Sequence, residues 1–395
     1  MIFPKKPQLL YAPMLATFGG GSANGFRSAA AASPVFGYAV AKSTNGANGI
    51  THFDPETMSY LGAYNTASTN DKAQNCMVSS THLFYNYGYD TSTVTMQPKT
   101  NLDPVYGTTL SVNSESRGNM TMDQNYVYVP MNNNAVSRRS RSNWGSSFSL
   151  PIYGGGNAEI YATALDSNYF YAGGGGGDIA IFYRSNLNSV QVTSLPNFNT
   201  LSSIMSDDTH VFCTGYNGSY VNHQSIYRVS KANFSQVDHA TVHFNSLGTN
   251  ATAAAYTNAV HVDGTYVYTV GRSSNAVVRW NKSTMGFDSS LPINGSYSHN
   301  GSPLSMDHGK GMTADKDHLY VAGDCNLGQV IIKVKKSNMT IVGAITLPNQ
   351  TTDFNFWSGG RHIAIDNMEG GPCHWYRSGV SNYNITDNES NILPS

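Results

Sequence analysis

The nine residues "DGTYVYTVG" (263–271) decide the fold, because the same pattern recurs along the chain. Each copy opens with acidic, amide or hydroxyl residues and continues with alternating aromatic and β-branched residues. Asp or Asn beside small polar residues favours a tight turn, and the alternation that follows is typical of a strand. Further copies are "STHLFYNYG" (80–88), "DQNYVYVPM" (123–131), "DSNYFYAGG" (166–174), "DDTHVFCTG" (207–215) and "DKDHLYVAG" (315–323).

A second recurring segment alternates with the first, for example "VVRWNKSTM" (277–285). It indicates a strand that runs into a polar turn, which one apolar residue closes. The other copies are "ITHFDPETM" (50–58), "VTMQPKTNL" (94–102), "SRRSRSNW" (137–144), "IFYRSNL" (181–187), "IYRVSKANF" (226–234) and "IIKVKKSNM" (331–339). The closing residues are 42 to 54 residues apart, at Met58, Leu102, Trp144, Leu187, Phe234, Met285 and Met339.

These units number seven, and an eighth, degenerate copy is formed by "RHIAIDN" (361–367) with "HWYRSGVSNYNITD" (374–387). Units of about 40–50 residues with about four short strands each are the signature of a β-propeller. We therefore predict an all-β chain, a β-propeller of seven or eight four-stranded blades over residues 31–388. An extended N-terminal arm (1–30) and a C-terminal tail (389–395) flank it. The strand before each Asp-containing turn is predicted to be the innermost of its blade.

The composition excludes several classes of partner. Only 12% of the 395 residues are charged and the formal net charge is −1, so neither nucleic acid nor an anionic membrane is expected to bind. No apolar run reaches 18 residues, so no transmembrane helix is expected. The four cysteines lie far apart, which favours buried free thiols over a zinc or redox site, with disulfides as the alternative; they are Cys76, Cys213, Cys325 and Cys373.

No motif in the sequence predicts a catalytic residue, a cofactor or a metal ligand. The recurring acidic residues Asp123, Asp166, Asp207, Asp263 and Asp315 are most simply turn caps, with an ion held by the ring as the alternative. An enzyme would need charged groups at the mouth of the channel. The candidates for such a site flank the last two units, at Asp307, His308, Asp353 and Arg361.

Two groups of side chains are candidate ligand contacts. Tyr85, Tyr87 and Tyr89 alternate in "FYNYGYD", so their rings are expected on one face. There they would stack on sugars or contact another protein, with packing between blades as the alternative. Arg139 and Arg141 share one face of the basic stretch "RRSRS" (138–142). That stretch is expected to be a solvated outer strand, with contact to an acidic partner or a sugar acid as the alternative.

The N-terminal stretch "LYAPMLATFGGGSANGF" (10–26) resembles N-terminal segments of predicted structural proteins of marine tailed bacteriophages. Asn24 stands where those segments have Arg. The resemblance implies a virion component, present in several copies, whose arm docks on other virion proteins. The docking residues it implies are Leu10, Tyr11, Pro13, Met14, Leu15, Phe18 and Phe26. A cleaved leader of a secreted protein is the alternative for the same stretch.

Two functional hypotheses follow from these observations. The first is a non-enzymatic structural protein of a tailed-phage virion, whose propeller is displayed on the tail or capsid and binds a host-surface glycan or receptor. The second is an extracellular carbohydrate-active enzyme, a hydrolase or lyase, or a secreted binding propeller.

Overall fold

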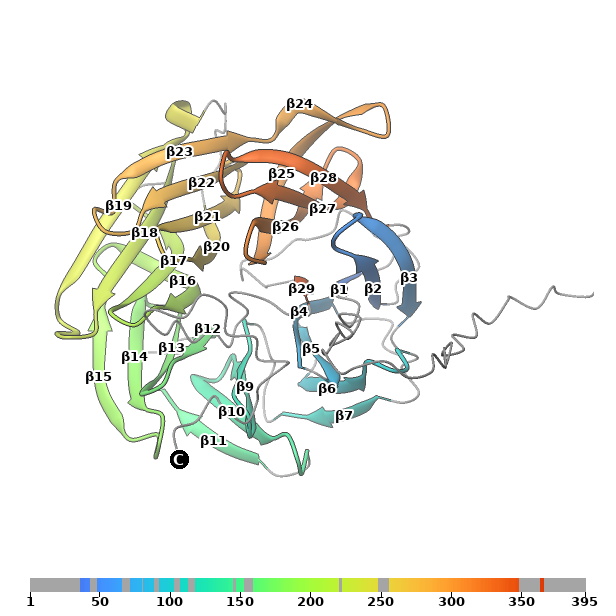
Figure 1. Ribbon diagram of the computed structural model, residues 1–395. Coiled ribbons are helices and arrows are strands. Elements are labelled where there is room, and N and C mark those ends of the chain that lie inside the picture. The colour runs from blue at the N-terminus through green and yellow to red at the C-terminus, as the bar shows by residue number, and fades with distance from the viewer. Residues whose placement is uncertain are drawn as a thin grey trace, which may run out of the picture. The chain divides into compact units, whose positions relative to one another are not determined.

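The computed structural model describes residues 36–42, 48–65, 72–79, 81–88, 92–102, 107–112, 118–144, 147–152, 159–219, 222–247, 256–347 and 363–365. These residues form seven antiparallel four-stranded blades arranged in a ring (Figure 1). The first strands of successive blades lie next to one another around the centre (Figure 1). The predicted all-β propeller is therefore confirmed, as is the position of the innermost strands.

Blades 1 to 4 occupy the first half of the chain. Blade 1 consists of β29 (Ile363–Ile365), β1 (Gly37–Lys42), β2 (Asn48–Asp54) and β3 (Ser59–Asn65). Blade 2 consists of β4 (Lys72–Val78), β5 (His82–Gly88), β6 (Thr93–Pro98) and β7 (Thr108–Ser111). Blade 3 consists of β8 (Thr121–Met122), β9 (Tyr126–Met131), β10 (Ala135–Ser140) and β11 (Ser147–Pro151). Blade 4 consists of β12 (Ile160–Leu165), β13 (Tyr169–Gly174), β14 (Asp178–Tyr183) and β15 (Ser189–Ser194).

Blades 5 to 7 are joined by two bridges, each between the second strand of one blade and the first strand of the next, at Tyr216–Tyr256 and Arg272–His308. Blade 5 consists of β16 (Phe198–Ser206), β17 (His210–Asn217), β18 (His223–Ser230) and β19 (Val237–His243), which is followed by the 3₁₀ helix η2 (Phe244–Leu247). Blade 6 consists of β20 (Tyr256–Val262), β21 (Tyr266–Arg272), β22 (Ala276–Asn281) and β23 (Phe287–Pro292). Blade 7 consists of β25 (Ser302–Ala314), β26 (His318–Cys325), β27 (Gly328–Lys335) and β28 (Thr340–Thr346), and β24 (Asn294–His299) pairs with the first part of β25.

The ring closes by pairing one segment near each end of the chain. β29 is antiparallel to β1, with Gly37 opposite Ile365 and Ala39 opposite Ile363. Part of the predicted eighth copy therefore completes blade 1, and the described strands make seven blades; residues 374–387 of that copy lie outside the described residues. Such closure protects the inner edges of the sheets, which would otherwise offer unpaired backbone groups.

The apolar residues that close the turns between third and fourth strands have an unusual backbone. Leu187, Met285 and Met339 adopt positive φ of 58°, 59° and 52°, a region that glycine usually occupies. Their side chains are nonetheless buried. Met58, with φ 55°, has the same backbone conformation, and its side chain packs against Gly343 of the preceding blade. Burying a Met or Leu gives about 2 kcal/mol, enough to offset a backbone strain of about 1 kcal/mol.

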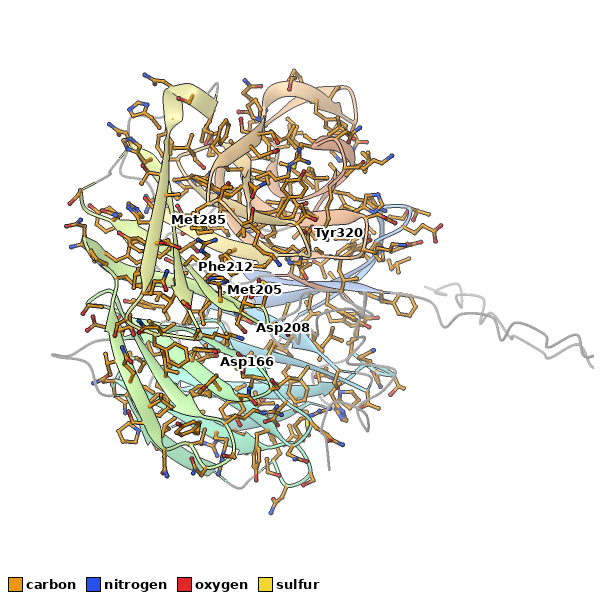
Figure 2. The ribbon with its side chains drawn as sticks, turned by 60° about the vertical axis from the view of Figure 1, so that its left-hand side comes forward. Asp166, Met205, Asp208, Phe212, Met285 and Tyr320 are labelled. Carbon is orange, nitrogen blue, oxygen red and sulfur yellow. The ribbon has the colours of Figure 1, made fainter. Side chains whose placement is uncertain are left out.

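The hydrophobic core lies between the blades and consists of clusters that each join adjacent sheets. Between blades 5 and 6, for example, Met205, Phe212 and Met285 pack in one cluster (Figure 2). Trp280 belongs to the same cluster. Cys76, Cys213 and Cys325 are buried thiols that form no disulfide, which confirms that prediction for three of the four cysteines. Cys373 lies outside the described residues. Within the described ranges, no helix is long and apolar enough to cross a membrane.

Candidate functional site

The recurring acidic residues cap the turns between first and second strands. In each such turn, one carboxylate oxygen accepts hydrogen bonds from the backbone N–H groups two and three residues later. The five turns repeat this geometry at 2.7–2.9 Å, at Asp123, Asp166, Asp207, Asp263 and Asp315. The predicted role as turn cap is confirmed, and all five turns lie on one face of the ring, here called the Asp-turn face.

The second carboxylate oxygen is also occupied. In four of the five turns it accepts a hydrogen bond from a tyrosine hydroxyl five residues later, at 2.7–3.1 Å, from Tyr128, Tyr171, Tyr268 and Tyr320. Burial, followed by the neighbouring carboxylate charge, raises the pKa of each of these tyrosines. The hydroxyl groups therefore stay protonated and serve as donors. Blade 5 has Phe212 at this position, so Asp207 has no tyrosine partner of this kind.

A basic residue from the next blade completes each of four turns. Lys231 of blade 5 pairs with Asp166 of blade 4 and also donates to the backbone carbonyl of Asp207. Arg184 pairs with Asp123 at 3.4 Å and donates to the carbonyl of Asp166 at 3.3 Å. The remaining pairs are Lys282 with Asp207 at 3.1 Å and Lys336 with Asp263 at 3.9 Å. We call these four contacts the inter-blade clamps.

The clamps influence the titration of the carboxylates. Burial by itself would raise the pKa of Asp207, but Lys282 and the N–H groups of Thr209 and His210 outweigh it and hold this pKa below 3.8. The ionised form is thus the one that the fold stabilises.

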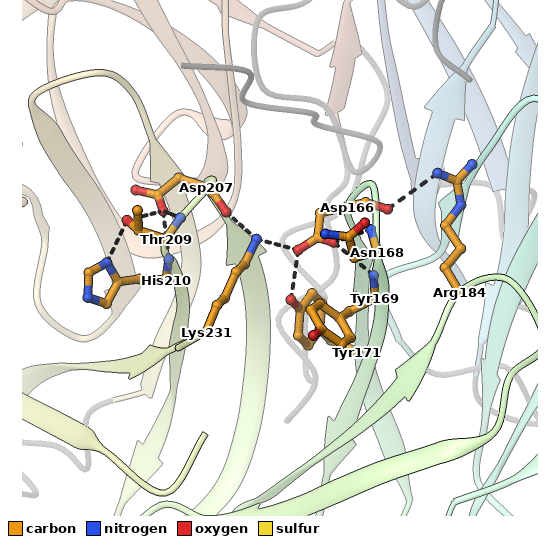
Figure 3. Close-up of polar contacts among 9 residues, drawn as sticks. All are labelled: Asp166, Asn168, Tyr169, Tyr171, Arg184, Asp207, Thr209, His210 and Lys231. Carbon is orange, nitrogen blue, oxygen red and sulfur yellow. Dashed lines mark hydrogen bonds and ion pairs between the residues drawn. The ribbon is translucent and has the colours of Figure 1, made fainter. Parts of the chain in front are cut away.

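One clamp forms the floor of a pocket between blades 4 and 5. The cavity has a volume of about 470 Å³ and opens on the Asp-turn face. Asp166 and Lys231 both line it and contact each other there, and the Tyr171 hydroxyl donates to the same carboxylate (Figure 3). Three turns supply the walls, with the residues Ser167, Asn168, Tyr169, Asp208, Thr209, His210, Ser230 and Ala232.

The aromatic wall of this pocket is held in place by its neighbours. The Tyr169 ring contacts Phe234 edge to face at 5.1 Å and stacks on Tyr183 at 5.8 Å. On the opposite wall, the Thr209 hydroxyl lies 2.8 Å from Nδ1 of His210. Burial, followed by the charge of Arg228, lowers the pKa of His210, so this ring is neutral near pH 7. The pocket therefore combines a fixed aromatic ring, neutral polar groups, one internal ion pair and the exposed carboxylate of Asp208.

The residues predicted from the sequence as ligand contacts do not line this pocket. Tyr85 is only 1% exposed and packs between blades, so its prediction as a surface contact is wrong and the packing alternative is the one observed. The side chain of Tyr87 and the whole of Tyr89 lie outside the described residues. Tyr85 is inward because the strand β5 is second from the centre, where both faces of the sheet are covered.

The basic stretch at 138–142 was expected on a solvated outer strand, which is also wrong. Its strand, β10, is third from the centre, and Arg139 is buried and donates to the carbonyl of Ser111 in blade 2. Arg141 is half-buried and donates to the carbonyls of Asp123 and Gln124. Both guanidinium groups thus hold backbone together, and neither is displayed as a ligand contact.

Residues considered for a catalytic site are only partly described. Asp307 and His308 lie on β25, whereas Asp353, Arg361 and the docking arm lie outside the described residues. Burial, followed by the charges of Lys310 and Arg272, lowers the pKa of His308 to about 4. In the part of the chain that the structure covers, no group of three or more His, Cys, Asp or Glu side chains could hold a metal ion.

Sequence reasoning missed the clamps and the pocket above one of them. A signal for the clamps was present, because six copies of the second segment carry a cation three residues before the closing apolar residue. These cations are Lys99, Arg141, Arg184, Lys231, Lys282 and Lys336, and the last four form the clamps. Nothing in a single repeat, however, shows that this cation reaches the Asp of another blade.

Comparison with known proteins agrees on the fold. No family model matches the sequence, and no curated protein matches it. Among solved structures, the chain is similar to the WD40 β-propeller domain of Doa1, with a TM-score of 0.55 and 13% identity, over 77% of this chain and 91% of that one. At that identity the likeness shows the fold alone. The chain is a β-propeller.

Proposed function

We propose that this chain is a non-enzymatic binding protein, and that the pocket between blades 4 and 5 is its ligand site. The observation that carries the proposal is the pocket itself, a hollow of about 470 Å³ with an aromatic wall and neutral polar groups. A concave site of this size with a few polar groups is typical of small-ligand recognition. The clamps on either side make its geometry rigid, which limits the entropy lost on binding.

The charged groups at the base of the pocket support binding in preference to catalysis. Asp166 accepts bonds from two backbone N–H groups, from Tyr171 and from Lys231. A general base or nucleophile needs a lone pair directed at the substrate. This carboxylate instead directs its oxygens at the protein, as the other clamped carboxylates do, and we assign it a structural role.

We further propose that the propeller is displayed on a tailed-phage virion, in several copies, and attached through residues 1–30. The support for this part is the resemblance of residues 10–26 to N-terminal segments of phage structural proteins. The ligand would then be a host-surface glycan or receptor. A secreted binding propeller is the alternative setting for the same pocket.

Two experiments test the two parts of the proposal. Particles assembled with a chain lacking residues 1–26 should contain no propeller, although the truncated chain should still fold; normal incorporation would refute the virion role. Full-length protein incubated with host surface polysaccharide should retain the glycan without cleaving it. New reducing ends or unsaturated uronates, absent in an Asp307→Asn control, would instead establish an enzyme.

A further inference from the structure

We infer that the pocket between blades 4 and 5 selects a neutral saccharide of one or two rings over sugar acids. This inference rests on the proposed binding function and specifies the ligand of the same site. It follows from three properties of the lining: its charge, its hydrogen-bonding groups and its aromatic wall.

The charge of the lining disfavours an anion. Lys231 is the one ammonium in the lining, and it is already paired with Asp166 at the base. Asp208 lies exposed at the rim, and His210 is neutral near pH 7. The carboxylate of a sugar acid would therefore lose part of its hydration in a site whose one ammonium is already paired with a carboxylate, which costs free energy. A neutral ligand carries no such cost.

The polar groups of the lining fit hydroxyl-rich molecules. The ammonium of Lys231 donates to Asp166 and to the carbonyl of Asp207, which leaves one N–H directed at neither. Within the described ranges, the hydroxyls of Ser167 and Ser230 and the side-chain amide of Asn168 make no hydrogen bond to the protein. These groups include both donors and acceptors, as the alternating hydroxyls of a sugar require.

The aromatic wall supplies the apolar part of the contact. Tyr169 is half-buried and fixed by Phe234 and Tyr183, so its ring needs no reordering when a ligand binds. Tyr183 is 47% exposed, and its ring therefore extends the aromatic surface beyond the pocket. Tyrosine offers large contact area at low entropic cost, and a pyranose ring can stack on it.

The same position between blades 6 and 7 has a different character. There the corresponding turns carry Lys316, Asp317, Lys335 and Lys336. Lysines thus stand at the places of Asp208 and Ser230, and blade 7 offers a matched control on the same face of the ring.

The experiment uses full-length protein and saturation-transfer NMR with methyl glycosides of neutral hexoses, of glucuronic acid and of sialic acid. We expect transfer to neutral glycosides only. Ser230→Tyr, which fills the cavity, should weaken binding by about tenfold or more, and Asn168→Ala by about fivefold, the equivalent of one lost hydrogen bond. The matched changes Lys335→Tyr and Thr265→Ala, at the corresponding positions of blades 7 and 6, should leave binding unchanged.

The outcomes separate the inference from the proposed function. Stronger binding of the acidic sugars, or neutral-sugar binding that survives Ser230→Tyr in a variant that melts like the wild type, overturns the inference and leaves a glycan-binding propeller. Absence of binding to every glycoside overturns the inference as well. In that case the virion role is tested separately, by the incorporation experiment.

Discussion

From the inter-blade clamps we predict that the burial of an ion pair, more than the distance between its charges, determines how much it contributes to the free energy of unfolding. The clearest perturbation is Asp166→Asn, which preserves the shape of the side chain and its acceptor for the turn N–H groups. The change removes the charge that faces Lys231. Both side chains are largely buried, at 10% and 11% exposure, so the ammonium would remain without a counter-charge in a poorly hydrated place.

The expected magnitude follows from the surroundings of Lys231. Breaking a buried ion pair by removing one partner costs about 3–5 kcal/mol. Because Lys231 would keep its bond to the Asp207 carbonyl and its place 5.9 Å from the Tyr171 ring, we expect about 3 kcal/mol, at the lower end. For a folded unit of about 300 residues, an unfolding entropy of roughly 0.6 kcal/mol/K converts this into a fall in Tm of about 5 °C.

The matched control is Asp238→Asn in the same blade as Lys231. Asp238 pairs with Arg228 at only 2.5 Å, but its side chain is 41% exposed. A solvent-exposed pair contributes about 0–1 kcal/mol, so Tm should fall by less than about 2 °C. Differential scanning calorimetry of both variants at the same pH and ionic strength provides the measurement. An equal or smaller loss for Asp166→Asn would refute the argument that the clamp stabilises the ring.

Three further predictions concern acid stability, ring closure and a buried network. Because the folded-state pKa of Asp207 lies below 3.8, the stability that its carboxylate contributes is present above about pH 4 and is lost as the pH falls through the lowered pKa. Between about pH 6 and 2, the Tm of Asp207→Asn should therefore fall less than the Tm of the wild type. Ala364 of β29 is fully buried, so Ala364→Asp should open blade 1 and increase the hydrodynamic radius in light scattering, whereas an unchanged radius and Tm would argue against closure by β29. Thr269 accepts from Trp280 at 2.9 Å and donates to Gln224 at 2.6 Å, so Thr269→Val should cost about 2 kcal/mol in urea unfolding and Thr269→Ser much less.

The fold was largely predictable from the repeats, because each turn is built from contacts within a few residues. Asp263, for instance, binds the N–H groups of Thr265 and Tyr266, and this geometry depends on the local sequence alone. The alternation in "YVYTV" likewise indicates a strand without reference to any other part of the chain. The roles of Tyr85 and Arg139 were not predictable, since burial depends on the place of the strand within its blade.

The sequence by itself therefore determined the repeated unit, its turn caps and the propeller architecture, because these depend on short-range hydrogen bonds and on strand periodicity. The tertiary structure decided the partners across blades. Lys231 and Asp166 are 65 residues apart and meet only because adjacent blades pack face to face. The pocket above this pair arises in the same way, from three turns that no single repeat contains.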